Sequence, residues 1–162
     1  MNDFKKSKIT DRIFLGSYGG AVDLDFLKNE KITKVISCLG EGSPSYNDMP
    51  IQQKCIGFND FPNSNIIQYF KECLEFMDEN PTDKIFVHCM CGVSRSSTIV
   101  IAYLMWKRKA SLDETLEFVQ NKRRFVSPNI GFINQLKIFE KLLKEKQYDL
   151  KKIDFKTIKW PQ

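Results

Sequence analysis

One segment limits the possible folds of this chain more than any other, because two buried elements meet there across a very short loop. Residues 84–88 are apolar or β-branched and stand between turn residues, which predicts a strand. Residues 96–108 are strongly apolar over a helical length, which predicts a buried helix. A buried strand that turns directly into a buried helix is typical of a sheet covered by helices.

Further strands and helices alternate along the chain. The other predicted strands are short and bounded by turn residues, at 13–15, 34–38 and 53–58. The other predicted helices are marked by an apolar face or a helix-start signal, at 21–29, 65–79, 111–122 and 129–145. Such alternation implies a mostly parallel sheet covered on both faces. The predicted fold class is therefore α/β, with a mostly parallel central sheet flanked by helices and a surface loop at 40–50.

The length of 162 residues suits one domain, and 42% hydrophobic residues suit a globular one. We predict a folded domain over residues 1–146 and an extension over 147–162, which docks through Phe155, Ile158 and Trp160 or stays partly flexible. No apolar run reaches the roughly 20 residues of a membrane span. The first residues lack a signal-peptide apolar run and a myristoylation glycine. We therefore expect no membrane span, and the cytoplasm as the main location with the nucleus as a second.

The cysteines and charges exclude several classes of protein. Five cysteines are an odd number without paired zinc spacing, and Cys89 and Cys91 stand beside the sole histidine, His88. We expect neither a disulfide framework nor a metal site. The net charge of +5 is spread along the chain without a known nucleic-acid-binding module. We therefore expect no nucleic-acid partner, and the sequence indicates no obligate protein partner.

The loop between the strand at 84–88 and the following helix has the composition of an anion-binding cradle. A loop entering a helix directs backbone N–H groups and the positive end of the helix dipole into one space. Cys89 begins the loop, where this field favours its ionised thiolate. Arg95 closes the loop with a guanidinium that matches two phosphate oxygens, and Gly92 allows a close turn. Alone, a free cysteine is more often a buried structural residue.

The pattern His-Cys-x-x-Gly-x-x-Arg-Ser at residues 88–96 resembles the active-site signature of the protein tyrosine phosphatase superfamily. Residues 92–96, the helix at 101–105 and Ser-Pro-Asn at 127–129 are similar to the dual-specificity branch. The resemblance spans roughly residues 13–143. The chain has no room for the larger tyrosine-only domain and no N-terminal kinase-docking domain, so it resembles the small atypical dual-specificity phosphatases.

This resemblance implies a metal-independent phosphatase without a cofactor, in which the thiolate of Cys89 is the nucleophile and Arg95 holds the phosphoryl group. The remaining loop residues are expected to bind the phosphate: Met90, Cys91, Gly92, Val93 and Ser94. His88 and Asn129 are expected to support the site structurally. Neighbouring strand residues point to opposite sides, so His88 cannot act as the base of a cysteine protease on Cys89.

Two further residues are predicted to move or hold protons. Asp60 follows the strand at 53–58 and should lie at the carboxyl edge of the sheet, where such ligand sites form. We predict Asp60 as the general acid, although an aspartate before Pro62 is also a common turn residue. Asp83 precedes its strand and should lie at the opposite edge. Ser96 is expected to donate its hydroxyl to the Cys89 thiolate, and it can also cap the helix.

The sequence suggests phosphoproteins as substrates, with phosphotyrosine and phosphoserine or phosphothreonine as the groups cleaved. The catalytic loop is uncharged apart from Arg95, whereas lipid-directed members of the superfamily carry lysines there. A phosphoinositide or another non-protein phosphate ester is the alternative substrate. A phosphate-binding module without catalysis is disfavoured, because Cys89, Asp60 and Arg95 are all present.

Cys38, at the end of the strand at 34–38, is a possible redox partner of Cys89. Some superfamily members carry a "back-door" cysteine at the comparable strand end, and residues 35–38 resemble that arrangement. A Cys89–Cys91 bridge would strain the tight loop. The simpler interpretation is that Cys38 is a small buried side chain.

Overall fold

The computed structural model describes residues 3–159. Its centre is one sheet of five strands in the order β1-β2-β5-β3-β4. The strands are β1 (Lys6–Lys8), β2 (Ile13–Gly16), β3 (Lys34–Ser37), β4 (Gln52–Cys55) and β5 (Ile85–His88). Only β1 runs antiparallel to its neighbour, and the other four strands are parallel. The predicted mostly parallel α/β fold is therefore confirmed.

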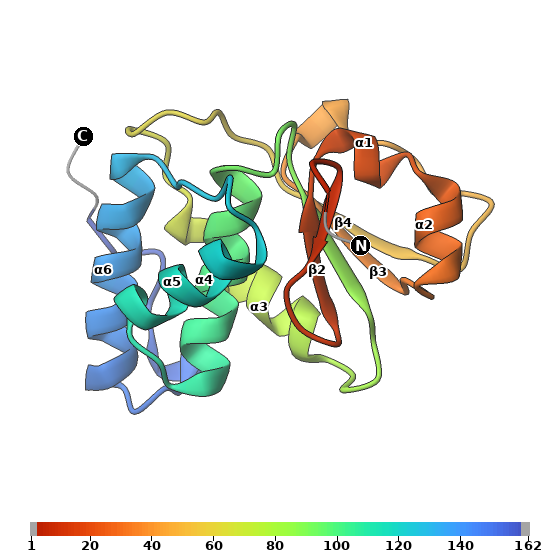
Figure 1. The fold of residues 1–162 in the computed structure, drawn as a ribbon. Coiled ribbons are helices and arrows are strands. Elements are labelled where there is room, and N and C mark those ends of the chain that lie inside the picture. Colours follow the sequence, from red (N-terminus) through yellow and green to blue (C-terminus); the bar gives the residue numbers. More distant parts are fainter. Residues whose placement is uncertain (1–2, 160–162) are drawn as a thin grey trace.

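Helices cover both faces of this sheet (Figure 1). The short α1 (Tyr18–Ala21) and α2 (Leu24–Asn29) lie on one side. The longer helices lie on the other side and are α3 (Phe70–Asp78), α4 (Arg95–Arg108), α5 (Leu112–Lys122) and α6 (Ile130–Glu145). Single 3₁₀ turns occur at Gly40–Gly42, Ile67–Tyr69 and Leu150–Lys152.

The sheet separates a large apolar core from a small one. On β5, Val87 joins the large core under α3–α6, whereas Phe86 joins the small core under α1 and α2. Successive strand side chains point to opposite faces, so β5 is buried at every position, with apolar residues from Ile85 to Val87. The helix α4 packs against β2, β5 and three other helices, and its residues 96–105 are all buried. This central place explains why its sequence is apolar around its whole circumference.

Three local features differ from the sequence-based expectations. The antiparallel strand β1 was not predicted, because it is short and carries two lysines. The helix expected at 21–29 is divided at Asp23, whose carboxylate accepts a hydrogen bond from the Phe26 N–H and starts α2. The strand expected at 53–58 ends at Cys55, because its neighbour β3 ends at Ser37.

The segment after α6 packs against the large core as far as it is described. Leu150, Ile153 and Phe155 are buried, and Ile158 packs against them. The indole N–H of Trp106 donates to the Tyr148 carbonyl at 2.9 Å. Trp160, also expected to dock, lies outside the described residues, and the domain boundary after residue 146 stays a prediction. Within residues 3–159, no helix has the length and apolar character needed to cross a membrane.

Candidate active site

Cys89 is the first residue after β5 and is 3% exposed. Its Sγ atom accepts a hydrogen bond from the Gly92 N–H at 3.2 Å and lies 3.1 Å from the Ser96 hydroxyl. Gly92 has φ of +68°, and a Cβ atom there would lie 2.5 Å from the Gly16 carbonyl oxygen. Only glycine fits this turn. Sγ therefore faces one backbone donor and one hydroxyl group.

The carbonyl groups of the loop at residues 89–94 all accept hydrogen bonds from outside the cradle. The donors are His88 Nδ1 for Cys89, the Tyr18 N–H for Met90, Arg123 Nη2 for Cys91, Arg123 Nε for Gly92, the Ser127 N–H for Val93 and the Thr98 N–H for Ser94. A peptide unit directs its N–H opposite to its carbonyl. Holding these carbonyls outward therefore turns the N–H groups inward, toward the anion-binding space.

Arg95 begins α4 and spans the edge of the cradle. Its Nη1 donates to the carbonyl oxygen of Phe58 at 3.3 Å and lies 3.5 Å from that of Cys38. Its Nε–H is buried and has no hydrogen-bond partner within residues 3–159. An unpaired buried donor of a guanidinium is costly. A phosphate oxygen in the cradle would supply the missing acceptor.

Asp60 lies at the carboxyl edge of the sheet, on an exposed segment after β4. Its Oδ1 accepts a hydrogen bond from Asn129 Nδ2 at 2.9 Å. Asn129 also caps α6 by accepting from the Phe132 N–H, and its own N–H donates to the Ser94 hydroxyl at 3.0 Å. One asparagine thus joins the carboxylate, the helix and the loop at residues 89–94. Asp83, which was predicted to lie at the opposite edge of the sheet, precedes β5 and forms an ion pair with Lys34 at 3.0 Å.

His88 points to the other face of β5 from Cys89 and is fully buried. Its Nδ1 must donate to the Cys89 carbonyl at 3.1 Å, because a carbonyl only accepts. Its Nε2 then accepts from the Ser37 hydroxyl at 2.7 Å, and Gln53 donates to that hydroxyl at 3.1 Å. Burial lowers the pKa of His88 to about 4. The imidazole is therefore neutral and orients the loop.

Arg123 was missed by the sequence analysis, because Lys-Arg-Arg at 122–124 has the appearance of an exposed basic run. Its side chain is 1% exposed and donates to the carbonyls of Cys91 and Gly92 at 3.0 and 2.9 Å. It also donates to the Phe4 carbonyl at 2.7 Å. Burial lowers the pKa of this guanidinium, although arginine still stays charged. It places a positive charge beside the cradle.

The predicted residues therefore come together at one edge of the sheet. Cys89, Gly92, Arg95 and Ser96 form the cradle, and Asp60 reaches it through Asn129. Within the loop, Ser94 is buried, Val93 is partly exposed, and Met90 and Cys91 are exposed. No cluster of possible metal ligands occurs among residues 3–159.

Cys38 lies directly beside Cys89. Its N–H donates to the His88 carbonyl at 2.9 Å, which continues the pairing of Ser37 with His88. Cys38 and Cys89 are thus the next residues after the paired ends of two neighbouring strands. Paired strands lie about 5 Å apart, and a disulfide needs Cα atoms within about 7 Å. Burial, then the nearby Cys89, raise the pKa of the Cys38 thiol well above its ordinary value.

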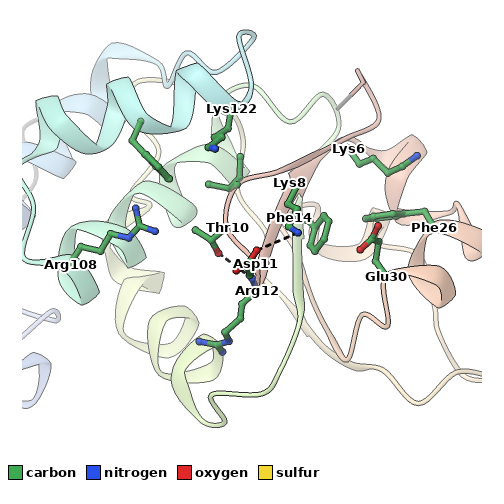
Figure 2. A pocket seen from close by; sticks show the side chains of 12 residues that line it. Lys6, Lys8, Thr10, Asp11, Arg12, Phe14, Phe26, Glu30, Arg108 and Lys122 are labelled. Atoms are coloured by element: carbon green, nitrogen blue, oxygen red, sulfur yellow. Dashed lines mark hydrogen bonds and ion pairs between the residues drawn. The ribbon is translucent and has the colours of Figure 1, made fainter. Parts of the chain in front are cut away.

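A separate pocket lies against β1, α2, α5 and the end of α4, and none of the predicted site residues lines it (Figure 2). Lysine and arginine side chains surround it, among them Lys6, Arg108 and Lys122. Arg12, which also lines the pocket, donates to the backbone carbonyls of Met77 and Asn80. These bonds give Arg12 a structural role.

The model of the family described as "Dual specificity phosphatase, catalytic domain" matches residues 13–142. The chain belongs to this family. The resemblance to dual-specificity phosphatases predicted from the sequence is therefore confirmed. The chain is a cysteine-dependent protein phosphatase. The matching relatives are protein phosphatases, so the alternative substrate, a non-protein phosphate ester, is not favoured.

Known dual-specificity phosphatases resemble the chain in sequence and in structure. Dual specificity protein phosphatase 1B of Arabidopsis thaliana is 39% identical over 137 residues, which cover 83% of this chain and 81% of that protein. The crystal structure of DUSP15 has a TM-score of 0.84 and 32% identity, covering 90% of this chain and 94% of that one. Protein-tyrosine-phosphatase MKP1 of the same plant is 35% identical, but the match covers 83% of this chain and only 17% of MKP1. The likeness to MKP1 concerns only the matched part.

His88 should remain neutral far below the pH at which a free histidine protonates. It is the sole histidine, so the long-range ¹H–¹⁵N spectrum contains a single imidazole. We expect the Nδ1–H tautomer down to about pH 5, because burial lowers the pKa to about 4. An Nε2–H tautomer, or titration near the ordinary value of 6.5, would contradict the hydrogen-bond chain.

The same shift makes stability depend on pH. Between pH 6.5 and 4 the unfolded chain binds a proton that the folded chain excludes, so unfolding becomes easier as pH falls through this window. The full effect is on the order of 3 kcal/mol. Urea unfolding of wild type and His88→Asn at pH 7 and pH 4.5 should show the larger loss in wild type. The carboxylates titrate in both proteins and cancel in this comparison.

Proposed function

We propose that the chain removes phosphate from phosphotyrosine and from phosphoserine or phosphothreonine in proteins, by two displacements at Cys89. The observation that carries this proposal is the Sγ atom of Cys89 between the Gly92 N–H and the Ser96 hydroxyl. An unpartnered Nε–H of Arg95 lies at the same cradle. Together these groups suit a nucleophile and the phosphoryl group that it attacks.

In the first displacement the Cys89 thiolate attacks phosphorus in line with the bond to the substrate oxygen. The P–S bond forms, the P–O bond breaks, and Asp60 gives its proton to the departing oxygen. Asn129 holds Asp60 by one oxygen and so can orient its carboxyl group. Arg95 and the loop N–H groups stabilise the charge on the transferred phosphoryl group.

In the second displacement a water molecule attacks phosphorus and gives its proton to the Asp60 carboxylate. The P–S bond breaks, inorganic phosphate forms and Cys89 leaves as a thiolate. The Ser96 hydroxyl, 3.1 Å from Sγ, donates to that thiolate and makes it a better leaving group. Both catalytic residues return to their starting protonation states.

Phosphoproteins are thus the proposed partners, as the names of the relatives suggest. Phosphate hydrolysis of this kind needs no metal, since the loop and Arg95 carry the charge. A location in the cytoplasm, with the nucleus as a second location, stays a prediction that cell fractionation would test.

Cys89→Ser should lower turnover of an aryl phosphate by at least about 10³-fold, because the nucleophile is lost. Vanadate should still bind in calorimetry, because the cradle is unchanged. Cys55→Ser, an exposed cysteine on β4, is the matched control and should retain activity. Substantial activity in Cys89→Ser, or loss of wild-type activity on adding a chelator, would disprove the mechanism.

Asp60→Asn should reduce kcat/KM for a phosphotyrosine peptide by about 10²- to 10⁴-fold, the usual contribution of a general acid. An activated fluorinated aryl phosphate needs no proton on its leaving group and should lose much less. Asp48→Asn, a change at an exposed aspartate of the loop at 40–50, serves as the control. If Asp60→Asn loses the same factor on both substrates, Asp60 has only a structural role.

We also propose that Cys38 protects Cys89 against peroxide. Peroxide oxidises the Cys89 thiolate to a sulfenic acid, and the Cys38 thiol then attacks that sulfur, forming the S–S bond and releasing water. The close pairing of the two strand ends supports this step. The raised pKa of Cys38 slows it, because the thiolate is the better nucleophile, so higher pH should accelerate it.

Peptide mapping after mild peroxide should therefore show a Cys38–Cys89 disulfide, forming faster as pH rises. Cys38→Ser should recover less activity with dithiothreitol than wild type, whereas Cys55→Ser should recover as wild type does. Equal recovery in all three proteins, with no bridged peptide, would leave Cys38 as a buried side chain of the core.

A further inference from the structure

The exposed large apolar side chains of the described chain gather around the cradle. Six of the eight such residues within 3–159 lie in the catalytic loop or in segments bonded to the site. They are Phe4, Tyr18, Phe61, Met90, Phe125 and Ile130, each between 37% and 64% exposed. Clustered apolar surface of this kind marks binding sites, whereas scattered residues need no explanation.

Four of these residues lie in segments bonded to the catalytic loop, and we call them the first patch: Phe4, Tyr18, Met90 and Phe125. The Tyr18 N–H donates to the Met90 carbonyl at 3.0 Å, which brings the segment after β2 against the catalytic loop. The rings of Phe4 and Phe125 are 5.5 Å apart in an edge-to-face arrangement. Arg123 bonds to the Phe4 carbonyl and to the catalytic loop. This patch therefore borders the loop that holds the phosphate.

The other two residues, Phe61 and Ile130, form a second patch beside the general acid. Phe61 directly follows Asp60, and Ile130 directly follows Asn129. The side chains of Asp60 and Asn129 are joined by a hydrogen bond of 2.9 Å. The backbones also approach closely, since a Cβ atom on Gly131 would lie 1.9 Å from the Pro62 carbonyl oxygen. Both side chains are more than half exposed, at 58% and 64%.

The sheet order places the two patches on opposite sides of Cys89. Tyr18 follows β2, Phe61 belongs to the segment after β4, and the catalytic loop follows β5 between them. An extended peptide advances about 3.3 Å per residue. A phosphorylated residue held in the cradle of an extended segment would therefore have the side chains of its second and third neighbours on each side directed along the line of the two patches.

We infer that this enzyme selects phosphorylated residues that have large apolar side chains on both sides in an extended protein segment. The inference rests on the proposed function, because it takes the cradle as the phosphate site. A membrane surface is the less suitable occupant. The catalytic loop at residues 89–94 has no basic side chain, and Asp60 is exposed at its rim. Exposed Lys5 and Arg124 adjoin Phe4 and Phe125, so binding to anionic vesicles is tested directly.

Two phosphotyrosine peptides of equal length and charge test this inference. One carries leucine and phenylalanine at the second and third positions on both sides, and the other carries serine and glutamine there. We expect the apolar-flanked peptide to have roughly tenfold higher kcat/KM, as partial burial of an apolar side chain on each side predicts. The ratio of the two values is the readout, so a general loss of activity does not affect it.

Phe61→Ser and Phe125→Ser, one from each patch, should each lower this ratio, and together they should bring it close to one. Leu24→Ser is the matched control, since Leu24 is 49% exposed on α2 and lies in neither patch. The control should keep the wild-type ratio. A ratio that Phe61→Ser and Phe125→Ser leave unchanged would overturn the assignment of the patches.

A wild-type ratio of one would overturn the inference and leave the proposed function intact. If the enzyme cleaves an aryl phosphate but neither peptide, the proposed function fails, and the inference with it. Vesicles of phosphatidylcholine containing a phosphoinositide provide the third arm. Binding of Cys89→Ser to these vesicles that is lost in the Phe61 and Phe125 variants, with a peptide ratio of one, would assign the patches to a lipid surface.

Discussion

The site depends on one constraint: the peptide groups between β5 and α4 must all turn their N–H groups toward the same point. Their carbonyl oxygens then face the protein, where each needs a donor, since an unpaired buried carbonyl is costly. The structure supplies these donors from remote segments, including the Tyr18 N–H, the Ser127 N–H and the Arg123 side chain. The segments that carry these donors therefore fix the conformation of the loop.

Positive charge also surrounds the loop between β5 and α4. The helix α4 directs its positive end into the cradle, Arg95 closes it, and the buried Arg123 lies behind it. Among residues 3–159, Arg123 donates its hydrogen bonds to carbonyl and hydroxyl oxygens and to no carboxylate. An anion in the cradle is the natural counter-charge. His88, in contrast, stays neutral, because burial outweighs the hydrogen bond that would favour its protonation.

The sheet brings the parts of the site together from distant positions. Parallel strands end at one edge, so the segments after β2, β3, β4 and β5 meet there and contribute Tyr18, Cys38, Asp60 and Cys89. The loop before α6 adds Asn129 across this edge. The same convergence brings exposed apolar residues to both sides of the cradle, where we propose that a substrate segment binds.

The sequence by itself determined the α/β class, the strand–loop–helix junction and the position of Asp60 at the carboxyl edge. These follow from local periodicity, from the spacing of Cys89, Gly92 and Arg95, and from the rule that parallel strands share one edge. Only the tertiary structure decided which groups hold the loop. In the sequence, Arg123 has the appearance of part of an exposed basic run. The residues around Gln53 and Ser37 do not predict their hydrogen bonds in the chain that ends at His88. Those contacts join residues tens of positions apart, and no pattern within one strand or helix specifies them.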